Sequence, residues 1–243
     1  MSVLRPVRRF FTNIVCAFVW DQTKRKKLRV MMNSPILTYL RFMRRDMGMP
    51  LGNIHFFIGY HAKSLLISAN NKYIYKFPLR HKNYRAMAMR EKRIVDALSP
   101  ISPLYIPPVE LIEYRGILIR KYDMIPGRGM RALPADVRAR FSDKLAREIA
   151  TFIDVIGRAD PMEIRDMKPQ PDVHPKPGMG WYHGDIFDNF LVDVETGKIN
   201  AVIDWEDCAF TDFGDHIASD HRPGVGDFMK RVAAEYQKIA VQK

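Results

Sequence analysis

The sequence predicts an α+β protein with two lobes, in which a small antiparallel sheet with one helix precedes a mainly helical lobe. Two observations support this fold class. Five short runs rich in isoleucine, leucine, phenylalanine and tyrosine lie between residues 53 and 122, and such residues favour strands. Residues 136–157 then carry apolar side chains at the spacing of a half-buried helix. A basic segment over residues 1–50 precedes both lobes, and we expect an amphipathic helical extension there.

The first lobe is expected to contain a five-stranded sheet. Its strands are predicted at residues 53–58, 64–69, 72–77, 109–113 and 117–122. The dipeptide Arg115-Gly116 forms the turn between the last two. Between the third and fourth strands, residues 83–98 predict a helix, because Ile94 and Leu98 lie on one side with other apolar residues.

The second lobe begins with the long helix at residues 136–157. Residues 158–180 contain five prolines and little periodicity, which indicates a loop. Residues 190–194 and 200–203 are expected to form two strands joined by a turn at residues 195–198. With 243 residues and 47% hydrophobic content, the chain is long enough for one such two-lobed unit with a proper core.

The residues on either side of this last hairpin have the chemistry of phosphoryl transfer. A His-Gly-Asp run ends at Asp185, Asn189 follows, and an Ile-Asp-Trp-Glu run after the hairpin contains Asp204. Transfer from ATP to an alcohol needs a carboxylate that orients the hydroxyl and accepts its proton, and oxygen ligands for Mg²⁺. Asp185 suits the first task. Asn189 at the hairpin entrance and Asp204 at its exit suit the second.

This ordered pattern resembles the aminoglycoside phosphotransferase and choline kinase family, small-molecule relatives of the protein kinases. The resemblance covers roughly residues 53–220. It implies a two-lobed protein-kinase-like fold, with a nucleotide-binding lobe at residues 51–125 and a catalytic lobe at residues 126–243. It also implies ATP and Mg²⁺ as cofactors. The site residues that it implies are Asp185 for catalysis, and Asn189 and Asp204 for the metal.

The loop departs from the family pattern at one point. The family usually places its amide one residue further from the base, whereas Asn189 comes only four residues after Asp185. Either the loop is shortened by one residue, or the amide role is displaced. In the second case Asp188 is the substitute ligand.

Asp212-Phe213-Gly214 repeats the Asp-Phe-Gly signature of protein kinases. We expect no strand directly before Asp212, whereas Asp204 ends an apolar run. Asp204 is therefore assigned as the metal ligand, and Asp212 with Asp215 is matched to a structural segment of the family.

Lys76 lies among apolar neighbours in the third predicted strand, where its ammonium would reach the α- and β-phosphates. In the family such a lysine is held by a glutamate from the next helix. Glu91 is the only glutamate between Lys76 and Glu110, so we predict a Lys76–Glu91 ion pair. The alternative is that Lys76 is an edge-strand solubility residue and Glu91 an ordinary surface charge.

Two further segments are expected to contact the nucleotide. Residues 59–64 contain one glycine and resemble the family's short phosphate loop, in which backbone amides cover the phosphates. Gly59 and His61 are the candidates there. Residues 123–127 resemble the hinge that binds the adenine edge through its main chain, with Met124 as the candidate.

Positive charge is concentrated at the N-terminus. Residues 1–50 contain eleven Lys and Arg against two Asp, a net +9 of the total +12. Residues 10–20 are mostly apolar but too few to span a bilayer, which needs about 20, and the basic residues 24–29 follow. Two interpretations of this segment remain open. Residues 1–30 could form an interfacial anchor that contacts anionic lipid, or a helix packed on the lobes with a solvated basic face. The pattern also faintly resembles a short element of bacterial cell-surface glycan enzymes.

Other classes are disfavoured. Aromatic and basic residues are not interleaved, and no nucleic-acid-binding motif is present. The histidines and cysteines lack the spacing of a zinc site. Cys16 and Cys208 do not make a disulfide framework and are expected to be buried thiols in a reducing compartment.

The favoured function is ATP- and Mg²⁺-dependent phosphoryl transfer to a hydroxyl of a sugar or glycolipid. About 23 residues follow Asp220, where the family adds helices that wall the acceptor pocket. We therefore expect an open acceptor site, suited to a lipopolysaccharide core or capsule precursor, on a protein in the cytoplasm or at the inner face of the cytoplasmic membrane. Two alternatives are a protein kinase, disfavoured by the missing three-glycine loop, and a non-catalytic pseudokinase scaffold, which the shortened loop favours.

Overall fold

The computed structural model has two compact units, and each is described by itself. Unit 1 comprises Met1–Ala88 and Glu110–Met124, and unit 2 comprises Met89–Val109 and Ile125–Lys243. The division falls inside one helix, α4 (Tyr84–Leu98). The structure describes residues 12, 14, 16–18, 20–32, 36–49, 54–58, 64–69, 71–79, 83–169, 179–212 and 226–241.

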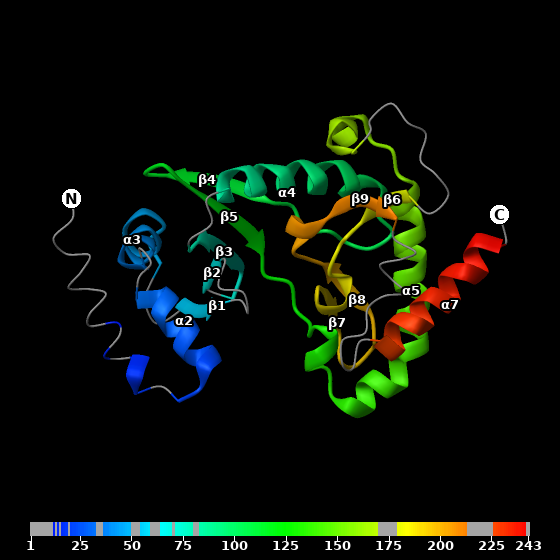
Figure 1. The fold of residues 1–243 in the computed structure, drawn as a ribbon, viewed down its shortest axis with the longest axis horizontal. Coiled ribbons are helices and arrows are strands. Elements are labelled where there is room, and N and C mark those ends of the chain that lie inside the picture. The colour runs from blue at the N-terminus through cyan, green and yellow to red at the C-terminus, as the bar shows by residue number, and fades with distance from the viewer. Residues whose placement is uncertain are drawn as a thin grey trace. The chain divides into compact units, whose positions relative to one another are not determined.

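Unit 1 contains a five-stranded antiparallel sheet with the order β1-β2-β3-β5-β4 (Figure 1). Its strands are β1 (Ile54–Ile58), β2 (Ser64–Ala69), β3 (Tyr73–Pro78), β4 (Glu110–Tyr114) and β5 (Ile117–Asp123). The five strands that the sequence predicted are therefore present, with ends displaced by at most one residue. Arg115 and Gly116 both have positive φ in the β4–β5 turn, at 50° and 76°, as a tight two-residue hairpin requires.

One face of this sheet packs against the N-terminal segment. That segment contains α2 (Gln22–Met32), α3 (Ile36–Arg41) and a π-helix, η1 (Phe42–Asp46). Tyr39 and Phe42 are buried in one cluster with side chains of β2, β3 and β5. Tyr39 stacks on Phe77 of β3 with ring centroids 4.4 Å apart, and its hydroxyl donates to the Pro78 carbonyl. Tyr39, Phe42, Met43 and Met49 thus belong to the core of unit 1.

The other face packs against the first turns of α4. Tyr84 and Ala88 are buried with Leu118 of β5, and Leu111 of β4 packs against them. Side chains on a strand alternate between faces, so the sheet of unit 1 is covered on both sides by helices.

Unit 2 is mainly helical. Its long helices are α5 (Ala135–Arg158), which was predicted at 136–157, and α7 (Gly226–Val241), which was not predicted. The two helices lie against each other (Figure 1). Its strands are β6 (Met179–Tyr182), β7 (Phe190–Val192), β8 (Ile199–Val202) and β9 (Ala209–Asp212), with β6 paired to β9 and β7 to β8. Its 3₁₀ helices are η3 (Ser99–Ile101), η4 (Met130–Ala132), η5 (Met162–Met167), η6 (Ile186–Asp188) and η7 (Trp205–Asp207).

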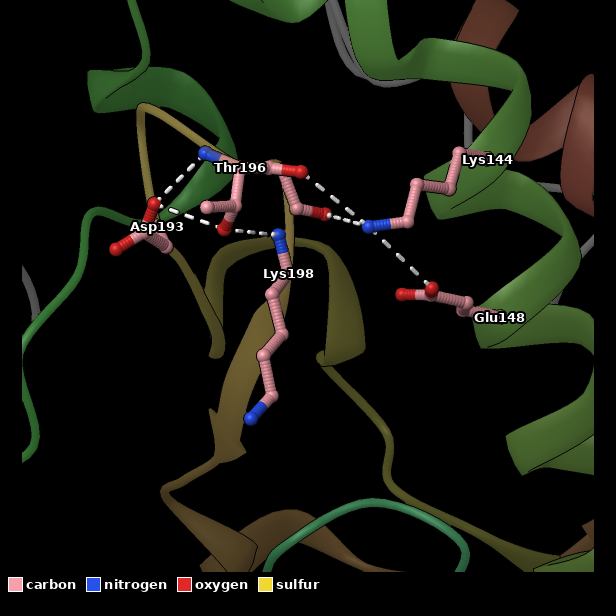
Figure 2. A network of polar contacts seen from close by, with 6 residues as sticks. Lys144, Glu148, Asp193, Thr196 and Lys198 are labelled. Carbon is pink, nitrogen blue, oxygen red and sulfur yellow. Dashed lines mark hydrogen bonds and ion pairs between the residues drawn. The ribbon is translucent and has the colours of Figure 1, made fainter.

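The turn of the β7–β8 hairpin is fixed by a polar network (Figure 2). The Asp193 carboxylate accepts hydrogen bonds from the backbone N–H groups of Thr196 and Glu195 and from the Thr196 hydroxyl, which lowers the pKa of Asp193. Lys144 of α5 donates to the carbonyls of Thr196 and Gly197, at 3.4 and 2.9 Å. The hairpin is therefore held on α5, and its open end is the part that positions the candidate site.

Among the described residues, no helix combines the length and the apolar composition that crossing a membrane requires.

Candidate active site

The loop after β6 is built around a buried histidine. The backbone N–H of Asp185 donates to His183 Nδ1 at 3.3 Å, and His183 Nε2 lies 2.9 Å from the Ile203 carbonyl. Because Nδ1 is an acceptor, Nε2 carries the proton and donates it to Ile203. Burial lowers the pKa of His183 from 6.5, which favours this neutral form. The imidazole thereby ties the Asp185 backbone to the residue just before Asp204.

Gly184 is required at its position in this loop. Its φ is +87°, which side-chain-bearing residues rarely adopt, and a Cβ there would lie 2.6 Å from the Asp207 carbonyl oxygen. The loop can therefore approach the segment that follows Asp204 only because residue 184 has no side chain.

Asn189 folds back onto the start of the same loop. The 3₁₀ turn η6 occupies the intervening residues, and Asn189 Nδ2 donates to the Asp185 carbonyl at 2.7 Å. Because the amide nitrogen donates this hydrogen bond, the amide oxygen is the atom that remains for a metal ion. Oxygen is the ligand type that Mg²⁺ prefers. The four-residue spacing thus still brings Asn189 back to Asp185.

Asp204 is placed by the exit strand of the hairpin. The Ile203 N–H donates to the Asn189 carbonyl at 2.8 Å, so Asn189 is hydrogen-bonded to the residue that precedes Asp204. Asp204 itself has φ 63° and ψ 63°, a left-handed conformation. For a residue other than glycine this conformation costs about 1–2 kcal/mol, and such strain is typical of functional sites. The structure therefore brings together three sequence-predicted residues, Asp185, Asn189 and Asp204.

Asp188, the alternative ligand, has another partner. Its carboxylate lies 2.9 Å from Nε of Arg131, which belongs to η4. An arginine cannot be deprotonated in proteins and would compete with a metal ion for the same oxygens. The geometry therefore favours Asn189 over Asp188 as the ligand.

The expectation that no strand directly precedes Asp212 was wrong. Residues 209–212 form strand β9, so a strand does lead into Asp212. Asp204 stays the predicted ligand for a different reason, because Asp212 pairs with Met179 at the far end of β6 from His183. His183 comes four residues after Met179, and at about 3.3 Å per residue along a strand this is a distance of about 13 Å.

Sequence reasoning missed the residues that support the loop. Arg90 of α4 donates to the carbonyls of Glu206, at 3.3 Å, and Cys208, and so fixes the chain just after Asp204. Phe228 of α7 packs its ring on Phe187 and Phe190, with centroids 5.7 and 5.9 Å away. No motif marks these residues, since an arginine in a helix and a phenylalanine near the C-terminus are common.

Cys208 is a buried free thiol, and burial raises its pKa to about 12. It therefore stays protonated at neutral pH and contributes packing rather than reactivity.

In unit 1, Lys76 is 6% exposed on β3. β3 lies between β2 and β5, so Lys76 does not lie on an edge strand. In unit 2, Glu91 is fully buried on α4 and is not an ordinary surface charge. These two findings oppose the alternative reading of both residues, while the Lys76–Glu91 ion pair stays a prediction.

The remaining nucleotide candidates differ in what the structure shows. The backbone N–H of Met124 donates to the Lys72 carbonyl at 2.7 Å, so in this conformation it does not serve an adenine ring. The Met124 sulfur accepts a contact from Ser68 Oγ at 3.4 Å. Gly59 and His61 lie outside the described residues.

Within the part of the chain that the structure describes, no group of three His, Cys, Asp or Glu side chains is arranged to hold a metal ion. Asn189 with Asp204 is a smaller set. Mg²⁺ is commonly bound by one or two protein oxygen ligands together with substrate phosphates and water, so the donor types of this pair fit it.

No protein-family model matches the chain, and no curated protein matches its sequence significantly. Solved structures do match. The GDP complex of wild-type aminoglycoside 2'-phosphotransferase-IIIa is similar with a TM-score of 0.62 and 16% identity, over 85% of this chain and 84% of that one. The fold is that of the aminoglycoside phosphotransferases.

Two other structures agree with this fold. The ternary complex of streptomycin, ATP and APH(2″)-IIa has a TM-score of 0.57 and 13% identity, over 82% of this chain and 83% of that one. Macrolide 2'-phosphotransferase type I has a TM-score of 0.58 and 14% identity, over 83% of this chain and 81% of that one. The protein-kinase-like fold predicted from residues 183–206 is therefore confirmed.

Proposed function

We propose that this protein is a phosphotransferase that moves the γ-phosphoryl group of ATP to a hydroxyl of a sugar-containing acceptor. The observation that carries the proposal is the closed set of hydrogen bonds linking His183, Asp185, Asn189 and Ile203. It holds one carboxylate, one amide and the strained Asp204 in a single loop system, on a fold shared with known phosphotransferases.

Each residue has one task in this proposal. The Asp185 carboxylate orients the acceptor hydroxyl and takes its proton as the phosphoryl group is transferred. Asn189 and Asp204 would hold Mg²⁺, which would neutralise charge on the phosphates. Lys76, paired with Glu91, would position the phosphates, so that catalysis comes mainly from alignment and charge.

The acceptor class is proposed from the ligands of the matched structures and from the exposed N-terminal side chains. The matched structures include complexes with the aminoglycosides kanamycin and streptomycin, which favours a sugar-type acceptor. For this chain we propose a membrane-held glycolipid, such as a lipopolysaccharide core or capsule precursor. Phe18 and Trp20 are 79% and 93% exposed, and the basic helix α2 follows them. Exposed aromatic residues beside basic residues suit an anionic lipid surface.

The first experiment is a thermal shift with ATP and Mg²⁺ on the wild type, Asp204→Asn and Asp212→Asn. A ligand at a hundred times its Kd stabilises the folded state by about 2.7 kcal/mol. We expect a Mg²⁺-dependent shift in the wild type and in Asp212→Asn, and its loss in Asp204→Asn. No shift in the wild type would refute the enzyme proposal and favour a pseudokinase scaffold.

The acceptor is tested separately, with radiolabelled ATP and three acceptors: an aminoglycoside, choline, and a lipopolysaccharide precursor in anionic vesicles. The proposal predicts label in the glycolipid. Robust turnover of a free aminoglycoside or choline with none of the glycolipid would overturn the acceptor class while leaving the phosphotransferase proposal intact. Trp20→Ser should lower activity on vesicles and leave binding of ATP unchanged.

A further inference from the structure

Two buried cations face each other on the sheet of unit 1. Lys76 of β3 is the direct cross-strand partner of Arg120 of β5. Arg120 is fully buried and Lys76 is 6% exposed. Directly opposite residues of an antiparallel pair lie on the same face with Cβ atoms about 4.5–5.5 Å apart. The face that carries Lys76 therefore carries a second, permanent positive charge.

Tyr84 of α4 connects these two residues. Arg120 Nε donates to the Tyr84 hydroxyl at 3.1 Å, and that hydroxyl donates to the Lys76 carbonyl at 2.6 Å. The Arg120 guanidinium also lies over the Tyr84 ring, 4.5 Å from its centroid. One tyrosine thus binds the arginine by its ring and its oxygen, and fixes the backbone of Lys76 at the same time.

Two cations placed this close together need compensating interactions. Like charges directly opposite each other in a sheet destabilise it, and a guanidinium cannot lose its proton to relieve the repulsion. The Tyr84 ring and hydroxyl offset part of this cost, and the predicted pairing of Lys76 with the fully buried Glu91 would offset more of it. A polyanion bound by Lys76 would interact favourably with both charges.

We propose that Arg120 is a positioning residue for nucleotide phosphates, acting through Tyr84 and Lys76. This inference rests on the proposed function and deepens it. Arg120 holds Lys76 through Tyr84 and adds its charge to the field that the phosphates experience. Because Arg120 is fully buried, it acts on the phosphates through its neighbours.

The test compares the affinities of ATP, with Mg²⁺, and of adenosine, measured by calorimetry. Adenosine occupies the base site but has no phosphate. In Arg120→Met we expect ATP affinity to fall by about tenfold or more, from the lost charge and hydrogen bond, with adenosine affinity unchanged. Tyr84→Phe keeps the ring and loses only the hydroxyl, so ATP affinity should fall by roughly threefold to tenfold.

Lys168→Met is the matched control. Lys168 is also buried, with its ammonium 4.5 Å from the ring centroid of Phe210, but it belongs to unit 2 and has no part in the proposed site. Its ratio of ATP to adenosine affinity should equal that of the wild type. Arg120→Lys keeps the charge without the guanidinium and provides a second variant should Arg120→Met not fold.

The outcomes separate the two proposals. A wild type that binds adenosine and ATP, with the same affinity ratio in Arg120→Met, Arg120→Lys and Tyr84→Phe, overturns the role of Arg120 alone. If these variants lose affinity for ATP and for adenosine to the same extent, Arg120 has only a structural role, and its proposed role in positioning phosphates is also overturned. A wild type that binds no ATP overturns the proposed function and this inference together.

Discussion

The residues proposed for catalysis in unit 2 and those proposed for phosphate binding in unit 1 are fixed by different kinds of contact. In unit 2, the groups around Asp185 are joined by hydrogen bonds between residues that are close in sequence, 4 apart for Asn189–Asp185 and 20 apart for His183–Ile203. In unit 1, the Tyr84 hydroxyl bonds the Lys76 carbonyl only 8 residues away, but Tyr84 is itself held by Arg120 of another element, 36 residues apart. Contacts between residues that are close in sequence can be recognised as a short motif, whereas contacts between elements that are distant in sequence produce no such motif. This difference explains why the first part was recognisable and the second was only partly so.

The strongest test of the local part is Asp185→Ala. Removing a general base typically lowers the rate by about 10²–10⁴-fold, and we expect this fall in kcat with little change in ATP affinity. The measurement is steady-state phosphoryl transfer beside calorimetric ATP binding.

Asp188→Ala is the matched comparison for that experiment. Asp188 is engaged by Arg131, so its loss should change kcat far less. If Asp188→Ala lost as much activity as Asp185→Ala, Asp188 rather than Asn189 would be the ligand. Lost ATP affinity in Asp185→Ala would mean that the loop roles are misassigned.

The next effect is on stability, through Gly184→Ala. The added Cβ would meet the Asp207 carbonyl oxygen at 2.6 Å in a backbone with φ +87°. We expect a loss of about 3 kcal/mol, from left-handed strain plus a backbone displacement. Denaturant unfolding followed by tryptophan fluorescence checks it, because Trp181 and Trp205 are buried in unit 2.

Gly48→Ala serves as the control for Gly184→Ala. Gly48 also has positive φ, at +63°, but among the described residues, its two chain neighbours aside, no atom lies within 4 Å of its added Cβ. Its cost should be only the strain, about 1–2 kcal/mol. Equal costs at both positions would show that the close approach of the loop to Asp207 is not needed.

The smallest effect is a pH dependence from His183. Its pKa is lowered in the folded state, so below 6.5 the unfolded chain binds more protons than the folded one, and stability falls as the pH falls. The slope from this group is at most about 1.4 kcal/mol per pH unit. Urea unfolding between pH 5 and 8 measures it, and the His183→Asn variant should show a flatter curve. Parallel curves would mean that His183 is not buried in its neutral form.

The N-terminal segment shows how composition alone can leave a choice open. Its charge and its apolar run were compatible both with an anchor and with a packed helix. The structure places Tyr39, Phe42 and Met43 in the sheet core, while Phe18 and Trp20 remain exposed. Packing on the sheet is therefore shown for the later part of the segment, while contact of residues 1–30 with a membrane stays a proposal. Hydrophobicity predicts burial but does not identify the partner surface.

The sequence by itself predicted the five strands of unit 1, the helix α5 and the β7–β8 hairpin, but neither α7 nor β9. It also located Asp185, Asn189 and Asp204 near that hairpin. It could do so because alternation, helical spacing and short motifs arise from interactions along the chain. It also predicted α5 to within one residue at each end.

Only the tertiary structure decided the rest. The ion pair of Asp188 with Arg131 and the distance of Asp212 from the loop depend on how elements pack and pair. The contacts of Arg90, Phe228 and Arg120 depend on packing in the same way. In each case the partner comes from another element of the fold. Contacts of that kind follow from the packing of the whole chain, which no local pattern encodes.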